Sequence, residues 1–394
     1  MRKIYDVAVI GSGLIGVTAA YELAKSGQKV ALLDAGGLSK GASSANTGLL
    51  LFEGASDNTA MELCRDSLTE YRNLNETLGV DTMFQKLNLI IFMQEEKERK
   101  EAKALSDTYK SHGFVSDIID NETIRELEPG FCLEKVNGAL YLEQWQMDPM
   151  KVVYGYFKRF REYGGDWYPY TPAVDFIYED HRILGVKTPS DTIYAGQFVV
   201  AAGAWSRELM AKVGFDLHEY YINGAAMVAE RGGCELRHGV YPFANPRIRD
   251  EQAAGRMAME VGWENVTPID AMEPALIPDV HGTLLVAERI HIGPEMMGAM
   301  PASYLRDMAA SVLEYFPGFS GSRIIRSWIT PVPFVPGGQP FFGFVKPFDN
   351  LFISSGYVSV LVMAPVLGAM TKRMLLGENP GYDVREYDPM RFER

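Results

Sequence analysis

The chain opens with two apolar segments separated by a glycine-rich turn and a helical segment. Residues 6–10 are almost wholly apolar and predict a strand buried on both faces, and residues 29–33 predict a second such strand. Residues 11–16 read Gly-Ser-Gly-Leu-Ile-Gly, and the stretch 17–26 predicts a helix that ends at Gly27. This order of strand, glycine turn, helix and strand predicts a Rossmann-like unit that binds a dinucleotide.

Each polar or glycine position of this unit has a physical role. Gly11 allows a tight turn, Gly13 lets the backbone approach a pyrophosphate, and Gly16 permits close packing of helix on strand. Asp34 follows the second strand, where its carboxylate can accept hydrogen bonds from a ribose diol, which favours NAD or FAD over NADP. The neighbouring candidates for cofactor contact are Leu14, Ile15 and Ala35.

Farther along the chain, the hydrophobic spacing changes repeatedly between helical and strand-like. Apolar residues at helical spacing predict helices over 57–78, 95–110, 122–127, 149–163, 301–315 and 365–376. Asp148 is the expected N-cap of the fourth of these, with Pro149 in its first turn. Runs rich in β-branched and aromatic residues predict strands or strand ends over 84–93, 170–174, 182–187, 192–195, 198–200, 225–230, 283–291 and 350–355.

The order of these elements predicts an α/β fold in two interleaved parts. Buried strands near residues 198 and 351, each followed by a glycine, return the chain to the sheet of the first unit. We therefore expect a discontinuous Rossmann-like domain made of residues 1–80, 141–211 and 324–394. Residues 81–140 and 212–323 are expected to form a second, α+β domain that is built on an antiparallel sheet and binds the substrate.

Composition excludes several classes of partner. With 47% hydrophobic residues the 394-residue chain can bury a large core, and its net charge of −13 disfavours nucleic acid and anionic membranes. The three cysteines are widely spaced and the histidines form no metal-binding pair, so we expect no metal. The longest apolar run, at 358–370, is too short for a transmembrane segment, and the first strand leaves no room for a signal peptide. We expect a cytoplasmic protein.

Four stretches resemble the D-amino-acid oxidase superfamily, which includes glycine oxidase and sarcosine oxidase. They are the glycine turn with Asp34, the small-residue loop 41–50, the strand and glycine at 199–206, and the block 351–368. In the order of the chain, the resemblance assigns cofactor contacts to Gly41, Ala42, Ser43, Ser44, Asn46, Thr47, Gly48, Leu49, Val174, Ala202, Gly203, Trp205, Gly356, Tyr357, Val358 and Ser359.

The resemblance implies a cofactor and a reaction. It implies non-covalent FAD, because no cysteine or histidine stands where some relatives attach the flavin. Family members take a hydride from a carbon next to an amine nitrogen, giving an imine that water hydrolyses; the flavin carries the chemistry, so no catalytic triad is expected. The turn at Gly356 would direct backbone N–H groups toward the flavin pyrimidine carbonyl. A further glycine that many relatives have just after it is absent here.

The substrate anchor of the family is missing. Many relatives clamp the substrate carboxylate with an arginine, and this chain has Val332 at that place, within Trp-Ile-Thr-Pro-Val-Pro. Residues 49–52 supply no arginine either. Either an arginine of the second domain replaces the clamp, the candidates being Arg289, Arg247, Arg249 and Arg256, or the substrate is not a simple α-amino acid. The residues we expect nearest the substrate are Arg289, His291, Tyr221 and Leu50.

Three functions remain open at this stage. The first is an FAD-dependent oxidase or dehydrogenase of a small amine or amino acid, which uses oxygen as acceptor if it is an oxidase. The second is the flavin-bearing subunit of a dehydrogenase complex that passes electrons to a partner subunit. No lysine occurs between Lys212 and Lys346, and since a lysine near the flavin promotes oxygen reduction in some oxidases, this favours a dehydrogenase. The third is a flavoprotein that has lost catalysis, which only the missing arginine favours.

Overall fold

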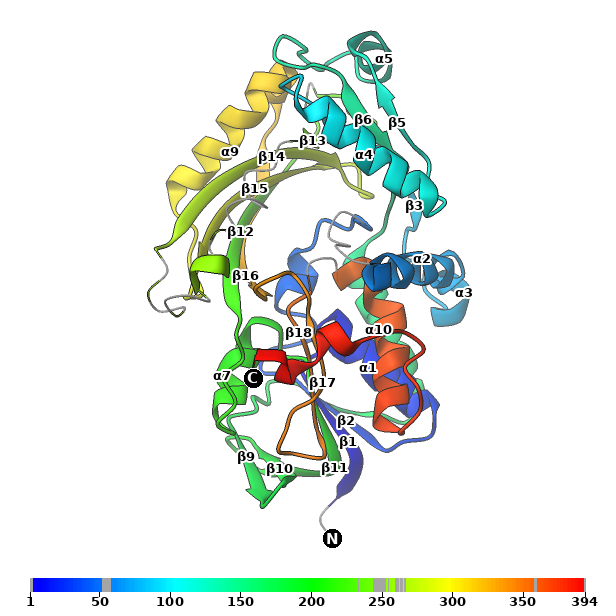
Figure 1. Cartoon of the computed structure of the whole chain (residues 1–394), viewed down its shortest axis with the longest axis vertical. Helices are drawn as coiled ribbons and strands as arrows, with labels where there is room; N and C mark the ends of the chain where they lie inside the picture. The colour runs from blue at the N-terminus through cyan, green and yellow to red at the C-terminus, as the bar shows by residue number, and fades with distance from the viewer. Residues whose placement is uncertain are drawn as a thin grey trace.

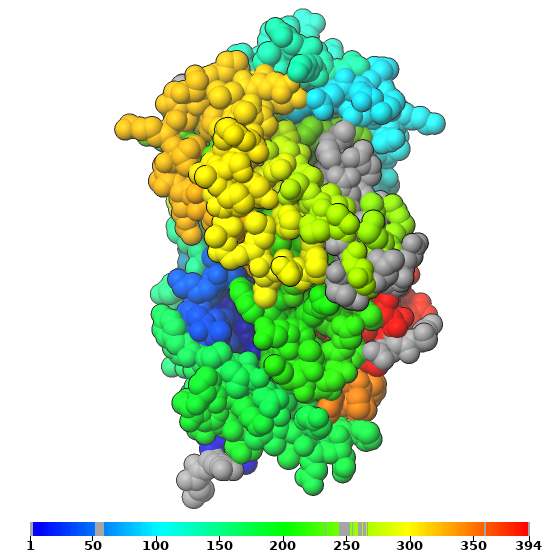
Figure 2. All heavy atoms as spheres, turned by 90° about the vertical axis from the view of Figure 1, so that its left-hand side faces the viewer, coloured from blue at the N-terminus to red at the C-terminus, as the bar shows by residue number. Residues whose placement is uncertain are grey.

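The computed structural model describes residues 3–51, 58–232, 234–243, 253, 255–258, 262, 265, 267–357 and 360–392. Two large sheets form the two halves of an elongated molecule, the first in the lower half of Figure 1 and the second arching above it. The space-filling view shows the same division, with the second sheet and α9 (Ala302–Tyr315) above the first sheet (Figure 2). The strand β16 (Ile324–Phe334) of the second half contacts residues 42–45 and 203–205 of the first half.

The first sheet has the order β17–β18–β11–β1–β2–β8, and its strands from β18 to β8 run parallel. The strands β10 and β9 continue it from β11 as an antiparallel pair. Their bounds are β1 (Ile4–Ile10), β2 (Val30–Leu33), β8 (Asp166–Tyr168), β9 (Asp175–Glu179), β10 (Arg182–Lys187), β11 (Thr192–Val200), β17 (Phe341–Phe344) and β18 (Leu351–Ser355).

Helices cover one face of this sheet. The helix α1 (Leu14–Lys25) packs against both α6 (Pro149–Glu162) and α10 (Val360–Leu375), and α10 packs against α2 (Asn58–Arg72), which α3 (Leu74–Leu78) follows. As predicted, Asp148 caps α6 and Pro149 is its first residue. The opposite face is covered by the β9–β10 pair and α7 (Ser206–Ala211), so the central strands are buried on both sides.

The second sheet has the order β16–β12–β15–β14–β13–β4–β6–β5 and is antiparallel except where β13 pairs with β4. The helix α9 packs on β14 and β15, α4 (Glu98–Ser111) packs on β5 and β6, and α5 (Asn121–Leu127) follows β5. A small separate sheet pairs β3 (Gln85–Lys86) with β7 (Trp145–Gln146). The strand bounds are β4 (Leu89–Phe92), β5 (Ser116–Ile119), β6 (Ala139–Leu142), β12 (Tyr220–Ala229), β13 (Gly239–Pro242), β14 (Ile269–Pro278), β15 (Leu284–Gly293) and β16 (Ile324–Phe334).

Several element boundaries differ from those the sequence predicts. The strands expected at 192–195 and 198–200 are one strand, β11, which continues through Gly196 because β1 pairs with it along this length. The stretch 84–93 is divided between β3 and β4, which belong to different sheets. Residues 170–174 form a loop, with β9 starting at Asp175. The strand β16 lies in the second sheet, although the predicted boundary at residue 324 assigns it to the first domain.

The final helix shows how tertiary contacts override a local signal. The sequence predicts that it begins at Pro365, whereas α10 begins at Val360 and contains this proline. Proline has no N–H to donate to the carbonyl four residues earlier, that of Leu361. The buried Tyr71 hydroxyl of α2 donates to the Leu361 carbonyl instead. A hydrogen bond from a helix distant in sequence thus satisfies the carbonyl that Pro365 leaves free.

Candidate functional site

A cavity of about 770 Å³ lies at the carboxyl ends of the parallel strands of the first sheet. The residues that follow β1, β2, β11 and β18 all line it, which is where ligands bind in open α/β sheets. Its lining residues are Ile10–Ile15, Asp34–Gly36, Lys40–Ser43, Thr171–Val174, Ala201–Trp205, Glu208, Leu209, Lys212, Val332, Pro333, Ser354–Tyr357 and Val360.

The glycine turn after β1 has no space for a side chain at Gly11 or Gly16. Gly11 has a φ of +102°, and a Cβ there would lie 2.2 Å from the Ala201 carbonyl oxygen. A Cβ on Gly16 would lie 1.8 Å from the Gly11 carbonyl oxygen, so this glycine sets the close approach of α1 to the turn. The expected roles of these two glycines in packing are therefore visible in the geometry.

The first turn of α1 faces the cavity with little protein capping. Gly13 is the N-cap and makes no side-chain cap hydrogen bond, while Ser43 Oγ accepts a hydrogen bond of 3.0 Å from the Leu14 N–H. Gly13 and Ser43 both line the cavity. Exposed N–H groups and the helix dipole make such a turn a site for a phosphate.

Asp34 links the second strand to the glycine turn. Its Oδ2 accepts hydrogen bonds of 2.7 Å from both the backbone N–H and the hydroxyl of Ser12, and its Oδ1 accepts one of 2.8 Å from the Gly36 N–H. The carboxylate also lines the cavity. It can therefore accept hydrogen bonds from a ribose while it fixes the turn beside it.

The loop 41–50 divides into a part that faces the cavity and a part that does not. Gly41, Ala42 and Ser43 line the cavity. Gly48 has a φ of +79°, and a Cβ there would lie 2.3 Å from the Met147 carbonyl oxygen, since the Met147 N–H donates to the Gly48 carbonyl at 2.9 Å. The end of the loop is thus held by the segment before α6 through backbone contact.

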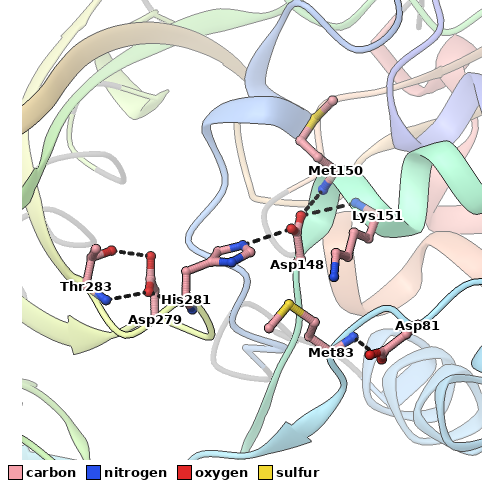
Figure 3. A network of polar contacts seen from close by, with 8 residues as sticks. All are labelled: Asp81, Met83, Asp148, Met150, Lys151, Asp279, His281 and Thr283. Atoms are coloured by element: carbon pink, nitrogen blue, oxygen red, sulfur yellow. Dashed lines mark hydrogen bonds and ion pairs between the residues drawn. The ribbon is translucent and has the colours of Figure 1, made fainter.

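The same segment contacts the second sheet. Asp148 Oδ1 accepts hydrogen bonds from the N–H groups of Met150 and Lys151, and Asp148 Oδ2 lies 2.9 Å from Nε2 of His281 (Figure 3). His281 belongs to the turn between β14 and β15, which Asp279 stabilises through Thr283 (Figure 3). One carboxylate thus caps α6 and joins the two halves of the molecule.

The other end of the cavity is formed by β16 and the turn after β18. Val332 and Pro333 meet Ser354, Ser355, Gly356 and Tyr357 there. The Tyr357 hydroxyl lies 2.8 Å from Ser354 Oγ, and burial raises the pKa of Tyr357 well above its usual value. The predicted contacts Val358 and Ser359 lie outside the described residues.

The residues expected nearest the substrate do not line the cavity. Arg289 and His291 both pair with Asp270 of β14, at 3.8 Å and 3.1 Å, and Arg289 lies over the Tyr304 ring of α9. Arg289 thus lies beside α9, and neither Arg289 nor His291 lines this cavity; their role as substrate contacts stays a prediction.

The other candidates are also absent from the lining. Leu50 is fully buried, and its N–H donates to the Trp145 carbonyl. Tyr221 is buried on β12, and burial raises its pKa. Arg256 is exposed and is not among the cavity residues. Arg247 and Arg249 lie outside the described residues.

Most of the predicted cofactor residues come together at this cavity. Those that line it are Gly11, Gly13, Leu14, Ile15, Asp34, Ala35, Gly41, Ala42, Ser43, Val174, Ala202, Gly203, Trp205, Gly356 and Tyr357. Those described but not among the lining residues are Gly16, Ser44, Asn46, Thr47, Gly48 and Leu49.

Sequence reasoning missed part of the lining. The missed residues that carry charge or shape the two ends are Lys40, Thr171–Ala173, Glu208, Lys212, Pro333, Ser354 and Ser355. Thr171–Ala173 follow β8, a parallel strand whose carboxyl end meets the same edge of the sheet, so a prediction of β8 would have found them. Pro333 carries no such signal, because only the register of the second sheet brings it to the cavity.

The described residues also bear on other classes of site. Among them, no group of three or more histidine, cysteine, aspartate or glutamate side chains could hold a metal ion. In the same described part of the chain, no helix is both long and apolar enough to cross a membrane.

Comparison with known proteins agrees with this geometry. A family model described as "FAD dependent oxidoreductase" matches residues 6–374. The chain is 24% identical over 392 residues to glycine oxidase of Bacillus licheniformis, covering 96% of this chain and 95% of that relative. It is 24% identical over 389 residues to 4-methylaminobutanoate oxidase (formaldehyde-forming) of Paenarthrobacter nicotinovorans, covering 98% of this chain but 45% of that relative. The structure of L-proline dehydrogenase from P. horikoshii superposes with a TM-score of 0.84 at 21% identity, covering 100% of this chain and 99% of that one.

Proposed function

We propose how this chain, which belongs to the family of FAD-dependent oxidoreductases, binds FAD and which amines it oxidises. The family match confirms the predicted cofactor and enzyme class, an FAD-dependent oxidase or dehydrogenase that acts on a C–N bond of an amine or amino acid. The α/β fold predicted from the sequence is confirmed as well. We propose the contacts of individual residues with FAD and the class of substrate.

The cavity is the proposed binding site of FAD. One observation carries this assignment: the glycine turn, the first turn of α1, the Asp34 carboxylate and the turn at Gly356 all line the same cavity. The first three suit a pyrophosphate and an adenosine ribose, which leaves the end at Val332 and Gly356 for the flavin ring. Side chains at Gly11 or Gly356 would clash with neighbouring atoms, so this shape depends on glycine.

FAD, when bound there, supplies the two-electron acceptor for oxidation of the C–N bond, which gives an imine that water hydrolyses. The described residues orient and enclose this chemistry. Asp34 and the start of α1 hold the nucleotide, and Val332 and Pro333 of the second sheet form the apolar wall at the opposite end. No cysteine or histidine occurs among the described lining residues, which supports a dissociable cofactor.

The substrate is proposed to be an amine without a carboxylate beside its nitrogen. Val332, at the place of the family's arginine, lines the cavity, and Arg289 is already paired with Asp270. The described cations of the lining are Lys40 and Lys212, and Lys40 lies beside Gly36, on the loop after Asp34. A buried carboxylate left unpaired at the Val332 end would cost several kcal/mol, roughly a thousandfold in binding.

The second domain remains part of the proposal. We assign residues 81–140 and 212–323 to a substrate domain, extended by β16, because their strands other than β3 form one sheet with β16, which contributes Val332 and Pro333 to the cavity. We also retain a cytoplasmic location, since all three cysteines are free.

A second candidate function is a dehydrogenase that passes electrons to a partner subunit instead of oxygen. The observation that favours it is the absence of lysine between Lys212 and Lys346, a range that contains most of the second sheet. Reoxidation of the reduced protein by air separates the two: fast reoxidation supports an oxidase, and slow reoxidation that an artificial electron acceptor accelerates supports the dehydrogenase.

The test of the main proposal is anaerobic bleaching of the flavin absorbance by a panel of amines, N-alkyl amino acids, and D- and L-amino acids. Amines that lack a carboxylate should bleach the flavin faster than glycine, sarcosine and D-alanine do. Rapid bleaching by these three small acids would show that another cation anchors the carboxylate. Acid precipitation in the same preparation should release all the yellow colour as FAD if the cofactor is non-covalent.

A further inference from the structure

A buried carboxyl group lies behind the turn that closes the flavin end of the cavity. Glu219, just before β12, is fully buried, and neither of its carboxyl oxygens has a hydrogen-bond partner in the described part of the chain. Its Oε1 lies 3.5 Å from the position that a Cβ on Gly356 would take. Gly356 and its neighbour Ser355 both line the cavity. The group therefore lies next to the cavity wall without being part of it.

The surroundings of Glu219 favour its uncharged form. The Ser355 hydroxyl lies beside the carboxyl without a hydrogen bond of normal geometry, and it too lacks a partner among the described residues. Burial raises the pKa of Glu219 to about 8, although the Ser355 hydroxyl and the Arg207 guanidinium of α7 oppose this rise. The Tyr221 hydroxyl of β12 faces the same region, together with Arg207 and Glu208.

The proposed chemistry does not use the Glu219 carboxyl group, and the stability of the fold does not require a carboxyl group at this position. A buried carboxyl with no partner destabilises a protein, and an apolar residue of similar size would avoid that cost. The position beside Ser355 and Gly356 is the feature that distinguishes it, because these residues contact whatever fills this end of the cavity.

We propose that Glu219 sets the reduction potential of FAD bound at this end of the cavity: uncharged, it leaves the potential unchanged, and ionised, it lowers the potential. This rests on the proposed placement of the flavin. Reduction adds negative charge to the cofactor, and a carboxylate buried nearby opposes that charge strongly in a low-dielectric environment. The neutral acid does not. Proton loss from Glu219 therefore makes the bound cofactor harder to reduce.

The test measures the midpoint potential of bound FAD against pH, from about pH 6 to about pH 9, in the wild type and in Glu219→Gln. Glutamine keeps the shape of the neutral acid and cannot ionise. The two potentials should agree at the acid end, and above about pH 8 the potential of the wild type should become more negative than that of the variant. Equal potentials at every pH, or a constant difference, would overturn the proposal.

Two further variants sharpen the result. Glu208→Gln removes an exposed carboxylate that lines the same cavity, and its effect on the potential should be small and independent of pH. Ser355→Ala removes the hydroxyl beside Glu219, so the pH at which the potential of bound FAD begins to fall should be higher than in the wild type. This variant also tests the proposal if Glu219→Gln fails to fold. A fall in potential at the same pH as in the wild type would overturn the proposal. Failure of the wild type to bind FAD would instead contradict the proposed function.

Discussion

The two ends of the cavity are built in different ways. The nucleotide end comes mainly from one continuous stretch, β1–α1–β2, in which Gly11, Gly13 and Asp34 are close in sequence and in space. The flavin end combines Val332 of the second sheet with the turn at Gly356 of the first, and the buried Glu219 lies behind it. The first end can hold a nucleotide common to a whole family, while the second is free to vary with the substrate.

The chemistry of the two ends differs as strongly as their construction. The nucleotide end offers backbone N–H groups, the Asp34 carboxylate and Lys40 beside Gly36, all of which suit a charged, polar ligand. The flavin end is walled by Val332, Pro333 and Tyr357, and the acid behind it favours its uncharged form. We expect substitutions at the first end to affect FAD binding, and those at the second to affect reduction and specificity.

The largest effect is expected from Gly11→Ala. The added Cβ would lie 2.2 Å from the Ala201 carbonyl oxygen at a φ of +102°, so the turn must move. We expect FAD binding to be lost and the free energy of unfolding to fall by more than about 3 kcal/mol. The matched control is Gly27→Ala: Gly27 has a φ of +91°, but no atom lies within 4 Å of the position of an added Cβ, so the free energy of unfolding should fall by only about 1 to 2 kcal/mol. Chemical denaturation measures both variants, and an equal fall in their free energies of unfolding would contradict the close approach at Gly11.

Val332→Arg should convert the flavin end toward the family's usual specificity. A guanidinium there can form a charge-assisted pair with a carboxylate, worth about 1.5 to 3 kcal/mol. We expect kcat/KM for glycine or sarcosine to rise by roughly tenfold to a hundredfold, with a smaller change for amines that lack a carboxylate. Val332→Met supplies a long side chain without charge and should give no such gain. A similar gain with methionine would point to the shape of the site instead of its charge.

Asp34→Ala should weaken FAD binding more moderately. It removes an acceptor for the ribose and also three hydrogen bonds that fix the turn, two of them to Ser12. We expect the dissociation constant for FAD, measured by flavin fluorescence, to rise roughly tenfold to a hundredfold. Ser12→Ala removes the hydroxyl that donates to Asp34 and accepts from the Ser39 N–H, but it leaves the Asp34 acceptor, so its effect on FAD affinity should be smaller. Unchanged affinity in Asp34→Ala would mean that the ribose lies elsewhere.

Part of this architecture could be predicted because its signals are local. The turn at Gly11 and the acid at Asp34 are encoded within one β–α–β unit, where each residue acts on neighbours a few positions away. The N-cap at Asp148 is equally local and is also confirmed. The start of α10 could not be predicted in this way, because the carbonyl that Pro365 leaves free bonds to Tyr71, far away in sequence.

The sequence by itself determined the nucleotide-binding unit, the FAD-dependent class of the enzyme and the absence of an arginine at position 332. Only the tertiary structure decided what surrounds Val332, because this depends on the pairing of Ile222 in β12 with Val332 in β16, more than a hundred residues later. It also decided that Arg289 pairs with Asp270 and that Glu219 lies behind Gly356. Strand register and burial determine these placements, and both result from long-range packing that no local pattern of residues specifies.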